Sequence, residues 1–333
     1  MAAVLDDPLR AARRAVQGGR FRDAEMALGE VPLPVQEGPE WHLLSAMAAW
    51  RLGDFTRSRT AAREARNAYR HRGDADGEMR AENVAAAGAF ALGDLDEAEQ
   101  GFTRAMLLAR RLQDELMTAR CANNIGNVAY YLTRRDVALS FYRLAEAAFE
   151  RIDYLVGVAE ARINLSIVLR EQHRPTEALE AAERALDAAE RGGSDRLSAQ
   201  ALVNCGAAAM ALGDPALGRA QAEHGLSLAR ASEDPLGEAE GERVLAGVAW
   251  MGGQVHEAER RLHDALALAT RLGHPWALGE IQLDLGKLLV GLGRFAEASQ
   301  AFEEARRAFL RVGSLPRADA AREAAHDANI TRG

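Results

Sequence analysis

Lysine is almost missing from this chain of 333 residues: Lys287 stands alone against forty arginines. Since alanine is also abundant, we interpret this bias as the base composition of a GC-rich bacterial genome and not as a functional signal. The formal net charge is −8. Affinity for nucleic acid depends on cations that neutralise phosphates, so an acidic chain is not expected to bind nucleic acid generally.

Long apolar runs are absent, and proline and cysteine are scarce. No stretch approaches the length of a membrane span, and Met1 leads into Asp6-Asp7-Pro8 without the basic and apolar regions of a signal peptide. Cys121 and Cys205 lie in different predicted helices and are expected to be buried, unpaired thiols. Such thiols fit a reducing compartment, so a cytoplasmic location is predicted.

Catalytic and metal-binding patterns are also lacking. Gly286-Lys287-Leu288 has neither the upstream glycine spacing nor the Ser or Thr of a phosphate-binding loop. His256-Glu257 is followed by His263, which is not the spacing of a helical zinc site, and no Cys/His pair has metal-ligand spacing. We therefore predict a protein that is not an enzyme and that uses no cofactor and no metal.

What the chain does have is a strict period. Tight-turn signals such as Leu52-Gly53-Asp54 and Leu92-Gly93-Asp94 recur, and the turn positions fall at 19, 53, 93, 133, 173, 213, 253 and 293. The first step is 34 residues and the following steps are 40 residues each. A fixed period in this range is typical of stacked helical hairpins.

Two offsets within this period are always occupied by small residues. Seven residues before each turn position stand Ala12, Ala46, Ala86, Gly126, Ser166, Gly206, Ala246 and Gly286. Five residues after it stand Ala24, Ser58, Ala98, Ala138, Ala178, Gly218, Ala258 and Ala298. Two helices can cross closely only where the side chains at the contact are small, so these positions are predicted to face each other within each hairpin.

On this register and these small residues, the chain resembles tetratricopeptide-repeat (TPR) proteins over essentially its whole length. The 40-residue repeat with Asn124-Ile125-Gly126-Asn127 in a first helix is similar to the arrays of Partner-of-Inscuteable proteins and of MalT-type bacterial sensors. The resemblance implies an all-α fold, a right-handed superhelical solenoid of about eight helical hairpins plus a C-terminal capping helix. We expect an atypical first hairpin and Pro-rich connector (1–39), seven repeats (40–313) and a capping helix with its tail (314–333).

The resemblance also implies a concave groove lined by one face of each first helix. Positions thirteen, ten, six and three before each turn share that face, and they carry cations, amides and aromatics. Such residues suit a peptide, since they combine apolar anchors with groups that pair with a backbone. The residues predicted to bind are Arg80, Asn83, Phe90, Arg120, Asn123, Asn127, Tyr130, Tyr131, Asn164, Arg170, Asn204, Arg243 and Trp250.

Two alternatives concern these side chains. Asn124, Asn164 and Asn204 lie nine residues before their turns, where hydrogen bonding between helices is an equally natural role. The aromatic stripe three residues before the turns also suits a hydrophobic core. A clamp for chaperone tails, as known in some TPR proteins, is not expected, because Gln200 and Asn204 stand where that clamp needs cations.

The sequence therefore predicts a scaffold for protein–protein interaction, monomeric or homodimeric, that binds a peptide or a segment of a partner protein in its groove. The first alternative is a ligand- or peptide-sensing module that regulates transcription or signalling through a partner. The second is a structural solenoid that assembles with itself through its ends.

Overall fold

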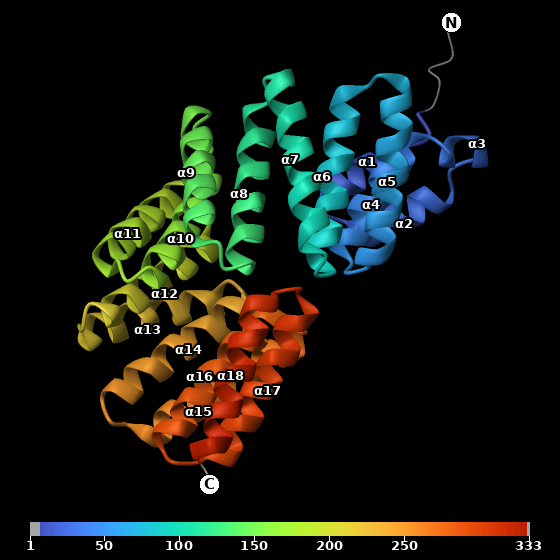
Figure 1. Ribbon diagram of the computed structural model, residues 1–333. Coiled ribbons are helices and arrows are strands. Elements are labelled where there is room, and N and C mark those ends of the chain that lie inside the picture. Colours follow the sequence, from blue (N-terminus) through green and yellow to red (C-terminus); the bar gives the residue numbers. More distant parts are fainter. Residues whose placement is uncertain (1–6, 332–333) are drawn as a thin grey trace, which may run out of the picture. The chain divides into compact units, whose positions relative to one another are not determined.

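A computed structural model describes residues 7–331, and within them the chain forms eighteen helices and no strand (Figure 1). Eight helical hairpins follow one another, with one short helix after the first hairpin and one long helix after the last. The helices are α1 (Arg10–Gln17), α2 (Phe21–Gly29), α3 (Leu33–Gln36), α4 (Pro39–Arg51), α5 (Phe55–Arg72), α6 (Ala75–Ala91), α7 (Leu95–Leu112), α8 (Glu115–Tyr131), α9 (Arg135–Arg151), α10 (Leu155–Glu171), α11 (Pro175–Arg191), α12 (Asp195–Ala211), α13 (Pro215–Ala231), α14 (Pro235–Met251), α15 (Val255–Leu272), α16 (Pro275–Gly291), α17 (Phe295–Arg311) and α18 (Leu315–Thr331). The expected all-α repeat fold is confirmed.

The turns inside the hairpins lie where the 40-residue register predicts them. Gly53 and Gly213 have φ angles of 84° and 81°, in the left-handed region that glycine adopts without steric penalty. Thr133 and His173 occupy the equivalent positions, each with φ 57°. A side chain in this conformation is strained, so the two hairpins without a turn glycine keep the same geometry at some energetic cost.

The small residues predicted at the helix crossings are all buried. A methyl group added to Gly206 would lie 2.9 Å from the carbonyl oxygen of Gly218, which is the small residue of the facing helix. In the preceding hairpin the Ser166 hydroxyl donates a hydrogen bond of 2.8 Å to the carbonyl of Ala178. The two small positions therefore meet in pairs, and the backbones of each hairpin approach closely at that point.

Caps mark the helix starts between repeats. The side chains of Asp74, Asp114 and Ser194 each accept a hydrogen bond from the backbone N–H three residues on, which satisfies one free donor of the first turn. His274 does the same through Nδ1. Asp234 differs, because its carboxylate accepts a hydrogen bond of 3.3 Å from the side-chain amide of Gln200.

The connector after the first hairpin is partly helical. Helix α2 ends at Gly29 as expected, but α3 then forms a single turn with Pro32 as its N-cap residue and Pro34 in its first turn. Proline is tolerated there because the first turn has no intrahelical partner for its N–H. The prolines thus interrupt the helix pattern without excluding a short helix.

Buried carboxylates link consecutive hairpins. Glu82 of α6 is almost completely buried and pairs with Arg66 of α5 and Arg104 of α7. Glu242 stands at the equivalent position of α14 and pairs with Arg230 and Arg261. Each carboxylate lies on the first helix of a hairpin. It pairs with the second helix of the preceding hairpin and with the second helix of its own hairpin, and in this way it joins neighbouring repeats.

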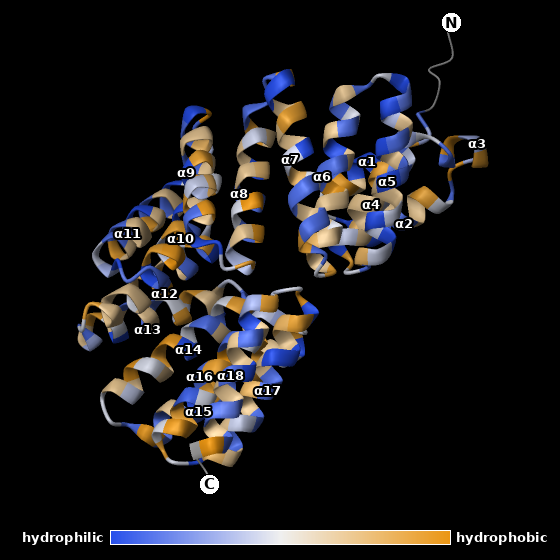
Figure 2. Ribbon diagram, viewed as in Figure 1, coloured by the Kyte–Doolittle hydropathy of each residue, from blue (hydrophilic) through white to orange (hydrophobic). Residues whose placement is uncertain are grey.

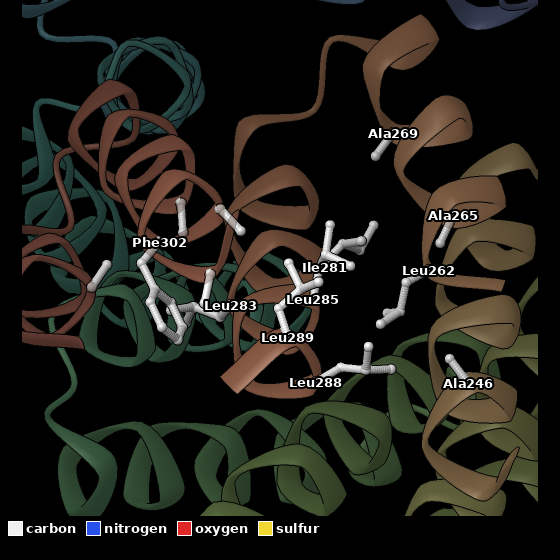
Figure 3. Close-up of a cluster of buried hydrophobic side chains, with 14 of the residues drawn as sticks. Ala246, Leu262, Ala265, Ala269, Ile281, Leu283, Leu285, Leu288, Leu289 and Phe302 are labelled. Carbon is white, nitrogen blue, oxygen red and sulfur yellow. The ribbon is translucent and has the colours of Figure 1, made fainter. Parts of the chain in front are cut away.

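The chain divides into two compact units, 1–128 and 129–333, with the boundary inside α8. In the second unit a large apolar cluster joins α14 to α18, and Figure 3 shows Leu262, Ile281 and Phe302 among its side chains. Helix α18 adds a row of buried alanines to this cluster: Ala318, Ala321, Ala325 and Ala328. Colouring by hydropathy shows orange and blue stretches alternating along the helices, as expected where one face of each helix is buried (Figure 2).

Cys121 and Cys205 are free and buried, and burial raises the pKa of each thiol to about 12. Thiols of this kind remain protonated and are poor nucleophiles. None of the described helices combines the length and the apolar composition that a bilayer span requires.

Candidate functional site

A cavity of about 480 Å³ in the N-terminal unit holds several of the predicted residues, and we call it the N-terminal cavity. Most of its lining comes from the first helices α4, α6 and α8, with further contributions from α1, α2 and α7. Its lining residues are Val16, Phe21, Met47, Trp50, Arg51, Asn83, Val84, Ala87, Phe90, Ala91, Phe102, Arg120, Asn124 and Asn127. The wall is therefore largely apolar and aromatic, with three amides and two guanidinium groups.

Both charged groups of this lining are cationic. The Arg51 guanidinium lies 5.6 Å from the ring centroid of Phe21 and 5.2 Å from that of Trp50, a placement that favours a fixed orientation of the cation. Arg120 is exposed on α8. Within residues 7–331 neither guanidinium has a carboxylate partner at ion-pair distance, so the N-terminal cavity has uncompensated positive charge.

The structure places four of the predicted binding residues in this cavity: Asn83, Phe90, Arg120 and Asn127. Asn124, for which bonding between helices was the competing role, lines it too, and its side chain makes no hydrogen bond to the described part of the chain. Asn123 is not among the lining residues. Arg80 lies outside the cavity on the exposed side of α6, where it pairs with Asp76 at 2.9 Å one turn earlier.

The C-terminal unit has two adjoining cavities, of about 330 Å³ and about 230 Å³, which we call the C-terminal cavities. They share Arg170, Ala207, Arg243 and Val244. Of the predicted residues, Arg170, Arg243 and Trp250 line the larger one, and Tyr130, Asn164, Arg170, Asn204 and Arg243 line the smaller one. The Asn204 amide donates a 2.8 Å hydrogen bond to the carbonyl of Gln200 in its own helix, so it does not join two helices.

Most charges in the C-terminal cavities are neutralised by neighbours. Arg243 lies 2.8 Å from both Glu240 and Asp284, and Lys287 lies 3.2 Å from Asp284. Burial opposes the charge of Arg243, yet these carboxylates hold its pKa well above the ordinary value. Asp284 is half-buried, and although burial acts to raise its pKa, Arg243 and Lys287 lower it. This group is a compact ionic network and not a set of free binding groups.

A contact between segments far apart in the sequence closes the C-terminal unit on itself. The Ser314 hydroxyl donates a 2.5 Å hydrogen bond to the carbonyl of Tyr131, across 183 residues. Arg317 of α18 reaches Glu171 of α10 at 2.5 Å, across 146 residues. Trp276 of α16 stacks on Tyr131 with ring centroids 4.0 Å apart and an interplanar angle of 17°. We call Tyr130, Tyr131, Glu171, Trp276, Ser314 and Arg317 the latch.

The latch has a charged centre. Glu171 accepts hydrogen bonds from the Tyr130 hydroxyl and from Arg135, both at 2.9 Å, in addition to its pair with Arg317. Burial acts to raise the pKa of Glu171, but these partners outweigh it and the pKa is lowered. Glu280, 3.5 Å from Arg317, shows the opposite balance, because burial raises its pKa and one of its oxygens lacks a hydrogen-bond partner.

Comparison with known families agrees with the register of the hairpins. Profiles of the tetratricopeptide repeat match residues 78–151, 158–191 and 237–311, together more than half of the chain. The chain belongs to the tetratricopeptide-repeat family. None of the curated protein sequences compared with this TPR chain matches it.

Solved structures show the same TPR fold at low identity. The apo form of the quorum sensor NprR from B. thuringiensis is 14% identical with a TM-score of 0.72, over 90% of this chain and 86% of that one. NprR in complex with its cognate peptide NprX is 13% identical with a TM-score of 0.62, over 100% and 99%. Aspartyl phosphate phosphatase F from Bacillus subtilis is 11% identical with a TM-score of 0.57, over 100% and 97%.

Sequence reasoning missed the latch of this TPR chain. Trp276 and Arg317 stand outside the offsets that define the first-helix face, so the repeat pattern did not single them out. Glu171 lies two residues before the turn at 173 and has no equivalent signal in the period. Contacts across 146 and 183 residues join repeats that are not neighbours, and a nearest-neighbour repeat pattern carries no information about them.

Proposed function

We propose that this TPR protein is a non-enzymatic scaffold that binds a peptide, or an extended segment of a partner protein, in its N-terminal cavity. The observation that carries the proposal is the combination of two unpaired arginines with amides and aromatic rings in one cavity. Apolar anchors in a pocket supply most of the affinity of a peptide complex, while amides and cations fix its register.

The positive charge of the N-terminal cavity limits the kinds of ligand that are expected to bind there. Arg51 and Arg120 have no carboxylate partner in the described part of the chain, so a ligand that brings a carboxylate gains a charge-assisted hydrogen bond without breaking an existing pair. Asn83, Asn124 and Asn127 provide donors and acceptors for a peptide backbone. We therefore expect a segment with at least one acidic residue, or a free C-terminus, next to large apolar side chains.

The similar structures support a peptide ligand only in general terms. One of them, NprR, is described with its cognate peptide, and another is described as a phosphatase. At this level of identity the likeness establishes the fold alone, so binding without catalysis is part of the proposal. A cytoplasmic setting is also proposed, because two buried, free thiols suit a reducing compartment.

The experiment is selection of a random linear peptide library on the immobilised protein, followed by fluorescence anisotropy on the enriched peptides. We expect enrichment of acidic and aromatic or aliphatic residues. Replacing both cations, Arg51→Gln with Arg120→Gln, should weaken binding by about tenfold or more, since a lost charge-assisted hydrogen bond is worth roughly 1.5–3 kcal/mol. Arg80→Ala is the matched control, because this arginine lies outside the cavity. Equal binding by the double variant would contradict the proposed site.

A sensing module that acts through a partner is the second candidate. The latch favours it, because a few side chains hold the C-terminal unit closed, and a contact of that kind has an open alternative. Changes in hydrogen exchange at α18 when a selected peptide binds would support a sensor. Unchanged exchange at α18 would favour a scaffold.

A further inference from the structure

One cation of the C-terminal cavities is not neutralised. Arg170 lines both cavities and is half-buried on α10, and its guanidinium makes no hydrogen bond and no ion pair with any described residue. Two carboxylates near it already have partners, because Arg243 pairs with Glu240 and Asp284, and Lys287 pairs with Asp284. An arginine held in a largely apolar cavity without a partner is unfavourable in the free protein, and an anionic ligand would relieve that.

The surroundings of Arg170 define the rest of the ligand. Met210, Val244, Trp250, Leu262 and Leu288 line the larger cavity and give it an apolar wall. A methyl group added to Gly247 would lie 2.7 Å from the terminal carbon of Met210, so the missing side chain at this position leaves room for the methionine. Together the two adjoining cavities fall in the volume range of sites for small molecules.

We propose that the C-terminal cavities form a second binding site, for a molecule that joins a single carboxylate to an aliphatic or aromatic body, with Arg170 paired to the carboxylate. The body lies against Met210, Val244 and Trp250. This site lies in the C-terminal unit and does not depend on the peptide site proposed for the N-terminal cavity.

The charged residues that line the C-terminal cavities favour a ligand with a single negative charge. Glu240, Glu280 and Asp284 all line these cavities, and a ligand with two or more negative charges would be repelled by them while only one free cation attracts it. A phosphate ester is thus a poor fit, whereas a carboxylate matches the planar, forked guanidinium in charge and geometry.

Two sources present this chemistry: the C-terminal residue of a peptide and a free organic acid. The test uses N-acetyl-L-leucine for the first and octanoate for the second, each titrated into the full chain by isothermal calorimetry. N-acetyl-L-leucinamide, which lacks the charge, is the ligand control. We expect at least one of the two acids to bind and the amide not to bind.

The protein variants decide whether Arg170 is responsible. Arg170→Gln should weaken binding of the acid by about tenfold, because one charge-assisted hydrogen bond is removed. Since the Arg170 side chain pairs with no described residue and its charge is unfavourable in the free protein, the melting temperature of this variant should not fall, which separates lost binding from lost folding. Arg80→Ala, which lies outside both the N-terminal and the C-terminal cavities, should leave binding of the acid intact.

Three outcomes would overturn the proposal: no binding of either acid, equal binding of the amide, or binding that Arg170→Gln leaves unchanged. Loss of acid binding in Arg120→Gln instead would move the carboxylate site to the N-terminal cavity. Failure of the peptide selection on the N-terminal cavity would leave this result unaffected, because the two tests change different arginines.

Discussion

The cavities of the two units use arginine in opposite ways. In the N-terminal cavity Arg51 and Arg120 lack carboxylate partners within the described chain, and both face a largely apolar lining. In the C-terminal unit Arg243 and Arg317 are half-buried against carboxylates of the same unit, and of the arginines lining its cavities Arg170 alone has no partner among the described residues. The arginines with internal partners hold helices together, and those without a partner are the ones expected to meet a ligand.

This difference shows why composition alone is a weak guide to a binding site. The same residue type stands on the first-helix face in both units, as Arg120 and Arg243 illustrate, and its role depends on whether a neighbouring residue supplies a carboxylate. Five substitutions test this comparison.

Trp276→Ala should have the largest effect. The ring stacks on Tyr131 and makes further contacts with Tyr130 and Phe309, so its removal should destabilise the C-terminal unit by about 3 kcal/mol. Urea denaturation measures the loss, and faster hydrogen exchange in α18 shows that the latch has opened. Trp250→Ala is the control, because this ring is 39% exposed and outside the latch; it should leave exchange in α18 unchanged.

Glu171→Gln and Glu280→Gln should act in opposite directions. The pKa of Glu171 is lowered, mainly because Arg317, Tyr130 and Arg135 outweigh its burial, so its stabilisation is present above its unfolded pKa, near 4.5, and is lost as pH falls through the folded value. We expect Glu171→Gln to destabilise by about 2 kcal/mol at neutral pH.

The pKa of Glu280 is raised, chiefly by burial, so its ionisation opposes folding above its unfolded pKa, and Glu280→Gln should not lower the melting temperature at neutral pH. Thermal melts of both variants between acidic and neutral pH measure these effects. A lower melting temperature for Glu280→Gln, equal to that of Glu171→Gln, would show that the two carboxylates of this region act alike.

Asp284→Asn should make the C-terminal cavities resemble the N-terminal cavity in having more than one cation that is not fully compensated by a carboxylate. The change removes a carboxylate that Arg243 and Lys287 share and leaves a second cation less compensated beside Arg170. Affinity for an acid such as octanoate should rise by about threefold to tenfold, in line with one further charge-assisted contact of roughly 1 kcal/mol. Calorimetry on this variant measures the rise, and an unchanged affinity would mean that Arg243 does not reach the ligand.

The repeat fold was predictable because its determinants are local. Turn glycines such as Gly53, caps such as Asp74 and the facing pair Gly206 and Gly218 each act within one hairpin or between neighbours, and the 40-residue period repeats them. Because these local signals agree with each other along the chain, the fold of a repeat protein can be predicted from its sequence.

The sites were predictable only in part. The first-helix face identified Asn83, Phe90, Arg120 and Asn127 as neighbours, and the structure brings these four into one cavity. The division of the chain inside α8, the latch and the buried Glu82 depend on contacts outside the repeat's own pattern. Whether an arginine finds a carboxylate is decided by side chains from other helices, so Arg170 and Arg243 look alike in the sequence.

Arg80→Ala should have the smallest effect, and it tests whether the bound segment stays within the N-terminal cavity. Arg80 shares its repeat position with Arg120, but it lies outside the N-terminal cavity and pairs on the surface with Asp76, one turn away. Exposed pairs of this type contribute less than about 0.5 kcal/mol, so stability by urea denaturation and peptide affinity by anisotropy should both stay within error of wild type. A clear loss of peptide affinity would mean that the bound segment extends beyond the cavity along α6, and the binding surface would then have to include positions that the cavity does not reach.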